Sequence, residues 1–150
     1  MATIVQFQKN LQKLLNRDAL ELILFEEIKR YENVFINLQK KQLNQGESND
    51  GELFGTYKLS TQNWARNYTP KKPKIAGQPY NFEDTGDLFK GMELRTDGKS
   101  AEFWSTDSKT DELIVKYDGL FGLRDDNLKE VISKVILPAF MIQIRQVLGL

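Results

Sequence analysis

The 150-residue chain contains no cysteine and no histidine. Without cysteine, the protein has no disulfide, no thiolate metal site and no cysteine nucleophile. Without histidine, it has no Ser-His-Asp triad, no imidazole acid–base group and no histidine-based zinc site. Any catalysis would depend on Asp, Glu, Lys or Tyr. We therefore expect a non-enzymatic protein that needs no cofactor.

The chain also has no excess of charge of either sign, because its 21 basic and 21 acidic residues cancel. This balance gives no electrostatic footprint for nucleic acid or for an anionic membrane, so direct binding to either is not expected. The N-terminus lacks the basic start, apolar run and cleavage site of a signal peptide. The most apolar stretch, between Lys134 and Arg145, has 10 uncharged residues, whereas a membrane span needs roughly 20.

Two N-terminal helices are predicted within residues 4–43. The first covers residues 4–15, with Thr3 as its N-cap. The second begins at Asp18, which can cap the first turn while Glu21 takes the reciprocal position, and ends near Leu43. Its apolar residues recur at steps of three and four, which predicts one buried face. They are Leu20, Leu24, Ile28, Tyr31, Phe35 and Leu38.

Residues 44–83 form a long irregular segment that contains three of the four prolines. A compact domain seldom holds a connection of about 40 residues without a purpose. The segment either packs on its own apolar side chains or becomes ordered only on a partner. The side chains available for such packing are Leu53, Phe54, Tyr57, Trp64 and Tyr68.

Residues 88–117 predict a small antiparallel sheet. Residues 88–96 and 99–106 flank Asp97-Gly98, a dipeptide typical of a tight hairpin turn, and residues 112–117 predict a third strand. Residues 125–148 predict a helix that is kinked at Pro138, because proline lacks an amide hydrogen and clashes with the carbonyl four residues earlier. Helices, then a sheet, then a helix indicate an α+β fold in a single domain over residues 1–150.

Three carboxylates, Glu83, Asp84 and Asp87, gather beside Gly86. Carboxylates this close could bind a divalent cation or act in acid–base catalysis. The alternative is a turn in which Asp84 or Thr85 caps the next element. Gly86 then adopts a positive φ and sets the entry into the first strand.

Three lysines, Lys71, Lys72 and Lys74, follow Trp64 and Tyr68. Basic groups beside stacking aromatics can hold single-stranded nucleic acid. The alternative is a solvated loop, which the neutral charge of the whole chain favours.

The run VILPAFMIQI, residues 135–144, is apolar on nearly every side. A helix of this kind must be covered all round. It is either a central core helix or a helix that a neighbouring subunit completes. Phe140, Met141 and Ile144 would form the subunit interface in the second case.

One ordered set of motifs lies within residues 31–95. A helix rich in Lys and Gln ends at QKKQLNQGESNDGELFGTYKLST, a Lys-Pro stretch follows, and GQPYNFEDTGDLFKGMEL comes next. This order resembles the virion morphogenesis or tail-completion (head–tail joining) family of tailed phages. The matching residues are Gly55, Tyr57, Ser60, Thr61, Asp84, Thr85, Gly86 and Leu88. The sequence departs from the family pattern at Asp87, where members often carry Arg.

The resemblance implies a small structural subunit at the head–tail junction or tail end, usually in a ring. The expected partners are further copies of the chain and other virion proteins of the tail tube, neck or portal-proximal region. The expected location is the virion, assembled in the bacterial cytoplasm. The alternatives are a small regulatory or nucleic-acid-binding module that uses Lys71–Lys74, and an acid-only hydrolase built on Glu83, Asp84 and Asp87.

Overall fold

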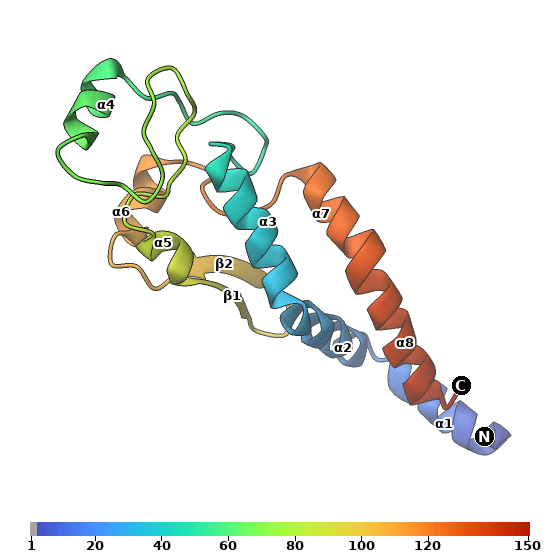
Figure 1. Ribbon diagram of the computed structural model, residues 1–150. Coiled ribbons are helices and arrows are strands. Elements are labelled where there is room, and N and C mark those ends of the chain that lie inside the picture. The colour runs from blue at the N-terminus through green and yellow to red at the C-terminus, as the bar shows by residue number, and fades with distance from the viewer. Residues whose placement is uncertain (1–2) are drawn as a thin grey trace.

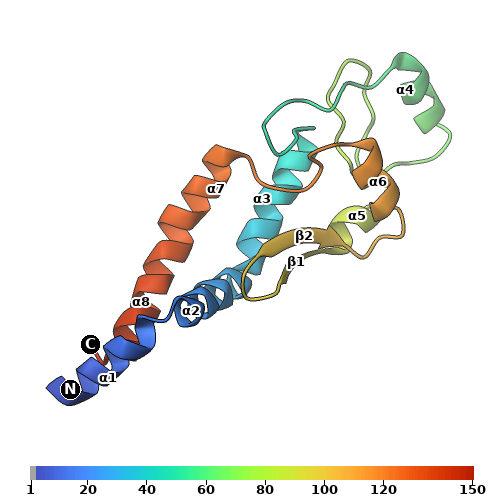
Figure 2. The same cartoon turned by 180° about the vertical axis from the view of Figure 1, so that it is seen from behind.

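The computed structural model describes residues 3–150 and confirms the predicted α+β fold (Figure 1). In chain order the elements are α1 (Ile4–Leu14), α2 (Arg17–Arg30), α3 (Glu32–Asn44), α4 (Leu59–Ala65), α5 (Asp87–Lys90), β1 (Met92–Thr96), β2 (Ala101–Ser105), α6 (Thr110–Lys116), α7 (Asp125–Val131), η1 (Ile132–Ile136) and α8 (Leu137–Leu148). Figures 1 and 2 show an elongated molecule. The sheet and α4–α6 lie towards one end, and α1 and the C-terminal end of α8 lie at the other.

The N-terminal helices follow the predicted pattern with two corrections. Thr3 caps α1 as predicted, since its hydroxyl accepts the Gln6 amide at 3.2 Å. The prediction that Asp18 caps the second helix is wrong, because Asn16 accepts the Asp18 amide at 3.0 Å and the helix begins at Arg17. The prediction of one helix up to Leu43 is also wrong, because the backbone leaves helical geometry at the junction between α2 and α3.

The sheet has two strands among the described residues, which pair antiparallel with Leu94 opposite Phe103. The Asp97-Gly98 turn is confirmed, with Gly98 at φ 85° and the Asp97 carboxylate accepting two following amides. The predicted third strand is wrong, because residues 110–116 form α6. The buried Thr110 hydroxyl lies within hydrogen-bonding distance of the carbonyls of Ser105 and Asp107, so this segment turns back directly after β2 instead of extending.

A charged pair on α2 and α3 holds the outer edge of β1. Lys29 donates to the Leu94 carbonyl at 2.7 Å, and Glu32 accepts the Leu94 amide at 2.9 Å. Burial acts to raise the pKa of Glu32, but the hydrogen bonds from Leu94 and Lys29 outweigh it, and this pKa is lowered. The outer edge of β1, which pairs with no other strand among residues 3–150, is therefore covered by the side chains of Lys29 and Glu32.

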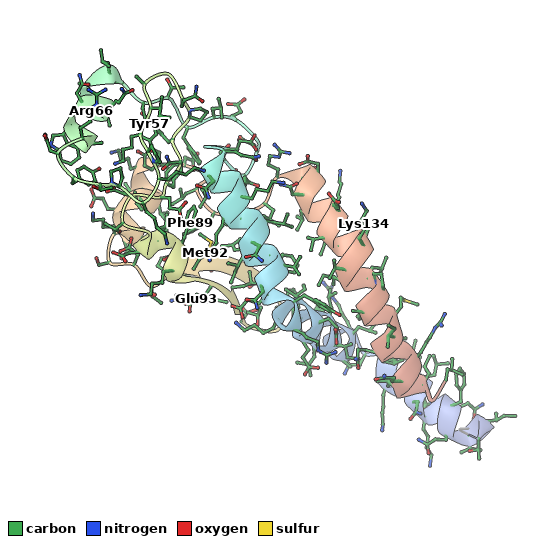
Figure 3. All side chains as sticks on the ribbon, viewed as in Figure 1. Tyr57, Arg66, Phe89, Met92, Glu93 and Lys134 are labelled. Carbon is green, nitrogen blue, oxygen red and sulfur yellow. The ribbon has the colours of Figure 1, made fainter. Side chains whose placement is uncertain are left out.

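Helix α3 joins two hydrophobic clusters. Phe35 belongs to one, with Ile28, Leu94, Leu123, Val131 and Ile136. Ile36 and Leu43 belong to the other, with Leu88, Phe89, Met92 and Leu120. Figure 3 labels Phe89 and Met92 beside α3, where these side chains meet it. The predicted apolar face of residues 20–38 thus covers the first cluster, and its residues Leu24, Tyr31 and Leu38 pack at the margin.

Two fully buried glutamines of α3 hold the segment that leads into α7. The Gln39 carbonyl oxygen accepts the Gly122 amide at 2.8 Å, and that of Gln42 accepts the Arg124 amide at 2.9 Å. The Gln42 amide group donates to the carbonyls of Gly122 and Ser48 at 2.8 and 3.2 Å. Buried polar backbone groups need partners, and these side chains supply them where no regular structure does.

The kink at Pro138 is confirmed, and the structure gives its form. Asp125–Leu148 is one continuous helix of 24 residues that contains the π-helical turn η1 just before Pro138. The Leu137 amide bonds to the Ile132 carbonyl, five residues back. The wider turn makes room for a proline ring that an α-helical carbonyl would obstruct.

Residues 44–83 are packed rather than free of structure. The segment contains α4 and three isolated β-bridges, one of which joins Thr56 to Pro79. Phe54 and Phe82 stack edge to face with each other and with Tyr117, at centroid distances of 5.0 to 5.6 Å. Of the two alternatives, the structure supports packing on the protein itself, although Leu53 and Trp64 stay exposed.

Replacing Gln42 by Leu should destabilise the protein strongly. The change keeps the volume but leaves the Arg124 amide and the Gly122 carbonyl without partners, at about 1–3 kcal/mol for each group that stays unpaired. The Ser48 carbonyl keeps its bond from the Gly51 amide. Gln45→Leu, on the exposed end of α3, is the matched control and should change the free energy of unfolding by no more than about 0.5 kcal/mol. Equal urea midpoints for the two variants would contradict this role of Gln42.

Candidate functional site

The Asp84-Thr85-Gly86 turn adopts the geometry expected of it but leads into a different element. Gly86 has φ 87° and stands at the N-cap of α5, so the predicted entry into the first strand is wrong and the strand begins only at Met92. The Thr85 hydroxyl accepts the Asp87 amide at 3.3 Å. A Cβ atom on Gly86 would lie 2.8 Å from Cδ of Lys71. Backbone conformation and space both favour glycine here.

Asp84 is held by Tyr68 and Lys74. The Tyr68 hydroxyl donates to the Asp84 carboxylate at 2.8 Å, and Lys74 Nζ lies 3.2 Å from the same oxygen and 2.7 Å from the hydroxyl. Burial works against the charge of both groups, but these contacts outweigh it. The pKa of Asp84 is lowered and the pKa of Lys74 is raised. The Asp84 carboxylate thus forms a structural ion pair with Lys74 and a hydrogen bond with Tyr68.

Gly55 and Tyr57 lie against residues 80–81. Gly55 has φ 151°, and a Cβ atom there would lie 2.9 Å from the Tyr80 ring. The Tyr57 hydroxyl accepts the Asn81 amide at 3.1 Å and donates to its side-chain oxygen at 3.2 Å. Burial raises the pKa of Tyr57. Both residues therefore join the first half of the 44–83 segment to its second half.

Most of the motif residues singled out from the sequence come together in space. Tyr57, Asp84, Thr85, Gly86 and Leu88 line one cavity of about 400 Å³, and Gly55 lies beside it against Tyr80. Their polar side chains are taken up by other residues of the chain. The geometry is that of a scaffold around a cavity whose carboxylates are already paired or in contact with solvent.

The acidic cluster does not form a metal site in the described chain. Residues 3–150 contain no group of three Asp or Glu side chains placed to hold a metal ion. Asp87 is exposed and bonds to the Thr85 hydroxyl at 2.9 Å, whereas Asp84 faces Lys74. The three carboxylates thus have different surroundings.

The three lysines are not presented together. Lys74 is largely covered and bound to Asp84, and Lys72 donates to the side chain of Asn44 at 3.1 Å. Lys71 packs over Gly86. The three lysines therefore do not form a continuous basic surface beside Trp64 and Tyr68.

Helix α8 is only partly covered, by α1 and α2. None of its residues is buried, and Met141 is 45% exposed. Of the two interpretations of residues 135–144, the core helix holds only for the beginning: Ile136 is buried in the first cluster and Val135 packs on it, but none of the α8 part is buried, because the sheet lies against α2 and α3 instead. Phe140 and Ile144 are half-buried.

Helix α1 contacts α8 near the C-terminal end of α8 and extends beyond it (Figures 1 and 2). We call the pair α1 and α8, with Leu15, the apolar arm. Its exposed large apolar residues are Ile4, Val5, Leu11, Leu15, Leu137, Met141 and Ile142. The continuous helix Asp125–Leu148 is also long and apolar enough to cross a membrane by length and composition, and 11% of its most apolar window is buried.

The residues that sequence reasoning missed are Gln39, Gln42 and Tyr117. Glutamines within a helix are usually solvent-exposed, and nothing in their spacing marks these two as buried hydrogen-bonding groups. Tyr117, which the sequence predicts to lie in a strand, follows the last residue of α6 as its C-cap and packs on Phe54. Comparison with known proteins adds no name to this site. No family model matches the chain, and no curated protein or solved structure matches it.

Gly86→Val should cost about 1–3 kcal/mol of stability, because valine strongly disfavours a positive φ and its side chain would displace Lys71. Asp87→Asn should change stability by less than about 0.5 kcal/mol, since the carboxylate is exposed and bonds only to a neighbouring hydroxyl. Thermal melts of the two variants test this asymmetry. A harmful Asp87→Asn beside a neutral Gly86→Val would show that the carboxylate has a specific partner.

Asp84 should stabilise the fold above its ordinary pKa of 3.8 and lose this effect in acid. Its folded pKa is lowered, so the contribution is complete above 3.8 and disappears as the pH falls through the folded value. The melting temperature difference between the wild type and Asp84→Asn should be largest near neutral pH and vanish in strong acid. Tyr68→Phe removes one donor and should shift acid unfolding to higher pH. A difference independent of pH would contradict the ion pair.

Proposed function

We propose that the protein is a non-enzymatic structural subunit of a tailed-phage particle, acting at the head–tail junction or tail end. The observation that carries this proposal is the apolar arm, which leaves seven large apolar side chains exposed at one end of the molecule. Exposed apolar residues gathered in this way are typical of a surface that another molecule covers. An assembly subunit has such a surface by necessity.

The motif set supports the choice of assembly. The motif residues Tyr57 and Asp84–Gly86 line one cavity, Gly55 lies beside it, and the polar groups are used in holding the chain together. A motif of this kind maintains the shape of a subunit. A structural component acts through its shape, so the motif fits that role. The proposed partners are copies of the same chain and other virion proteins of the tail tube, neck or portal-proximal region. The proposed location is the virion, after assembly in the host bacterial cytoplasm.

The nucleic-acid-binding alternative is less well supported. Lys72 and Lys74 have partners within the chain, and the net charge is zero. Binding to phosphate backbones depends on clusters of free basic groups.

A stop codon early in the gene should abolish infectious particles of the phage that encodes this protein. Electron microscopy should show separate heads and tails, or particles with incomplete tails, because the junction lacks one of its subunits. A plasmid copy of the wild type should restore the titre, and a copy with Leu59→Glu, an exposed site on α4, should do the same. Normal titre without the protein would refute the proposal. Retention of the purified chain on heparin at moderate salt would instead favour the nucleic-acid-binding alternative.

A further inference from the structure

The molecule also has an apolar groove beside the first half of the helix Asp125–Leu148, next to the arm. A groove of about 650 Å³ lies between β2 and α7, over α2 and α3. Its apolar lining includes Ile28, Phe35, Phe103, Leu123, Leu128 and Ile132. We call it the β2–α7 groove. Leu128 on its α7 wall is 41% exposed.

The arm of the same molecule cannot enter this groove. Leu128 and Ile132 line the groove from the first half of the helix Asp125–Leu148, and the arm is formed by the second half. The helix is continuous over 24 residues and therefore about 36 Å long. The two surfaces belong to successive halves of one helix, and the second half cannot fold back into a groove lined by the first, so only another molecule can bring an arm to a groove.

The charges on the two surfaces are opposite. The arm carries Lys9, Lys13 and Arg145, and no acidic residue occurs among residues 3–17 or 135–150. The ionisable carboxylates of the groove are Glu102 and Asp118, and no Lys or Arg lines it. Within residues 3–150, none of these five side chains forms an ion pair. Opposite charges around apolar surfaces favour one mutual orientation and speed the encounter.

We propose that the apolar arm of one copy of this chain binds in the β2–α7 groove of the next copy. The contact joins two different surfaces, so each subunit uses its arm on one neighbour and its groove on the other. A contact of this kind continues from copy to copy until the rotation between neighbours closes a ring. This inference deepens the proposed assembly function and rests on it only for the biological setting, because self-association is measured on the purified chain.

Two single variants test the contact. Met141→Glu places an acid on the exposed face of the arm, and Leu128→Lys places a base in the groove. The wild type should form oligomers in size-exclusion chromatography with light scattering, and each variant should weaken association by about tenfold or more. Leu59→Glu, which lies on α4 outside both surfaces, is the control and should associate as the wild type does. Ile142→Glu, at a site 56% exposed, replaces Met141→Glu if circular dichroism shows that variant unfolded, and Glu102→Lys replaces Leu128→Lys in the same way.

Mixing the two variants gives the decisive result. The arm variant retains an intact groove and the groove variant retains an intact arm, so the mixture should form a one-to-one heterodimer that grows no further. A contact between two arms would leave the groove variant fully associated and give no heterodimer in the mixture, which would overturn the proposal. A charge exchange adds a second check with two double variants. One carries Lys13→Glu and Arg145→Glu in the arm, and the other carries Glu102→Lys and Asp118→Lys in the groove. The first should associate with the second but not with itself.

A monomeric wild type at all concentrations would also overturn the proposal. If that monomer sediments with vesicles of phosphatidylcholine and phosphatidylglycerol at three to one, the arm is a membrane-binding surface instead. These outcomes are independent of the phage experiment. Loss of infectivity without self-association would refute the arm-to-groove contact and leave the structural function standing. Self-association with normal titre would refute the structural function in the phage and leave the arm-to-groove contact standing.

Discussion

The structure depends most on the hydrogen bonds that Gln39 and Gln42 make across the core. The segment 119–124 must pass from α6 to α7 over the side of α3, and it does so without regular structure. Its backbone groups are partly buried, and each would cost free energy if it lost water without gaining a partner. The two glutamines supply those partners from the C-terminal half of the helix that joins both hydrophobic clusters. They thereby set the direction in which the C-terminal helix leaves the body.

That direction determines which surfaces remain uncovered. Val131 and Ile136 reach the core, but beyond Pro138 the helix runs past the end of α2 and meets α1. Among residues 3–150, no further element covers the exposed face of α8 or the space between α7 and β2. The apolar arm and the β2–α7 groove are thus two consequences of one helix orientation. The proposed assembly function follows from surfaces that the fold exposes, and no reactive group is needed for it.

The cavity around Asp84 shows how a motif can require particular residues for structural reasons alone. Gly86 is required by a positive φ, Asp84 by Tyr68 and Lys74, and Tyr57 by its two bonds to Asn81. Each residue has a local physical reason for its identity. The carboxylates that suggested a cation site have different surroundings. Asp84 is paired with Lys74, and Asp87 is bonded to the Thr85 hydroxyl at the surface.

The amino-acid sequence by itself determined what depends on neighbours along the chain. The Thr3 cap, the buried face of residues 20–38, the Asp97-Gly98 turn and the kink at Pro138 all come from local sterics and periodicity. The absence of cysteine and histidine likewise excluded whole classes of chemistry. Tertiary structure decided whatever depends on distant partners. It made 110–116 a helix although its pattern suits a strand, because Thr110 bonds back to the end of β2. It buried Gln39 and Gln42, paired Asp84 with Lys74, and left α8 outside the core, since these outcomes follow from the packing of segments up to 83 residues apart and no local pattern encodes that packing.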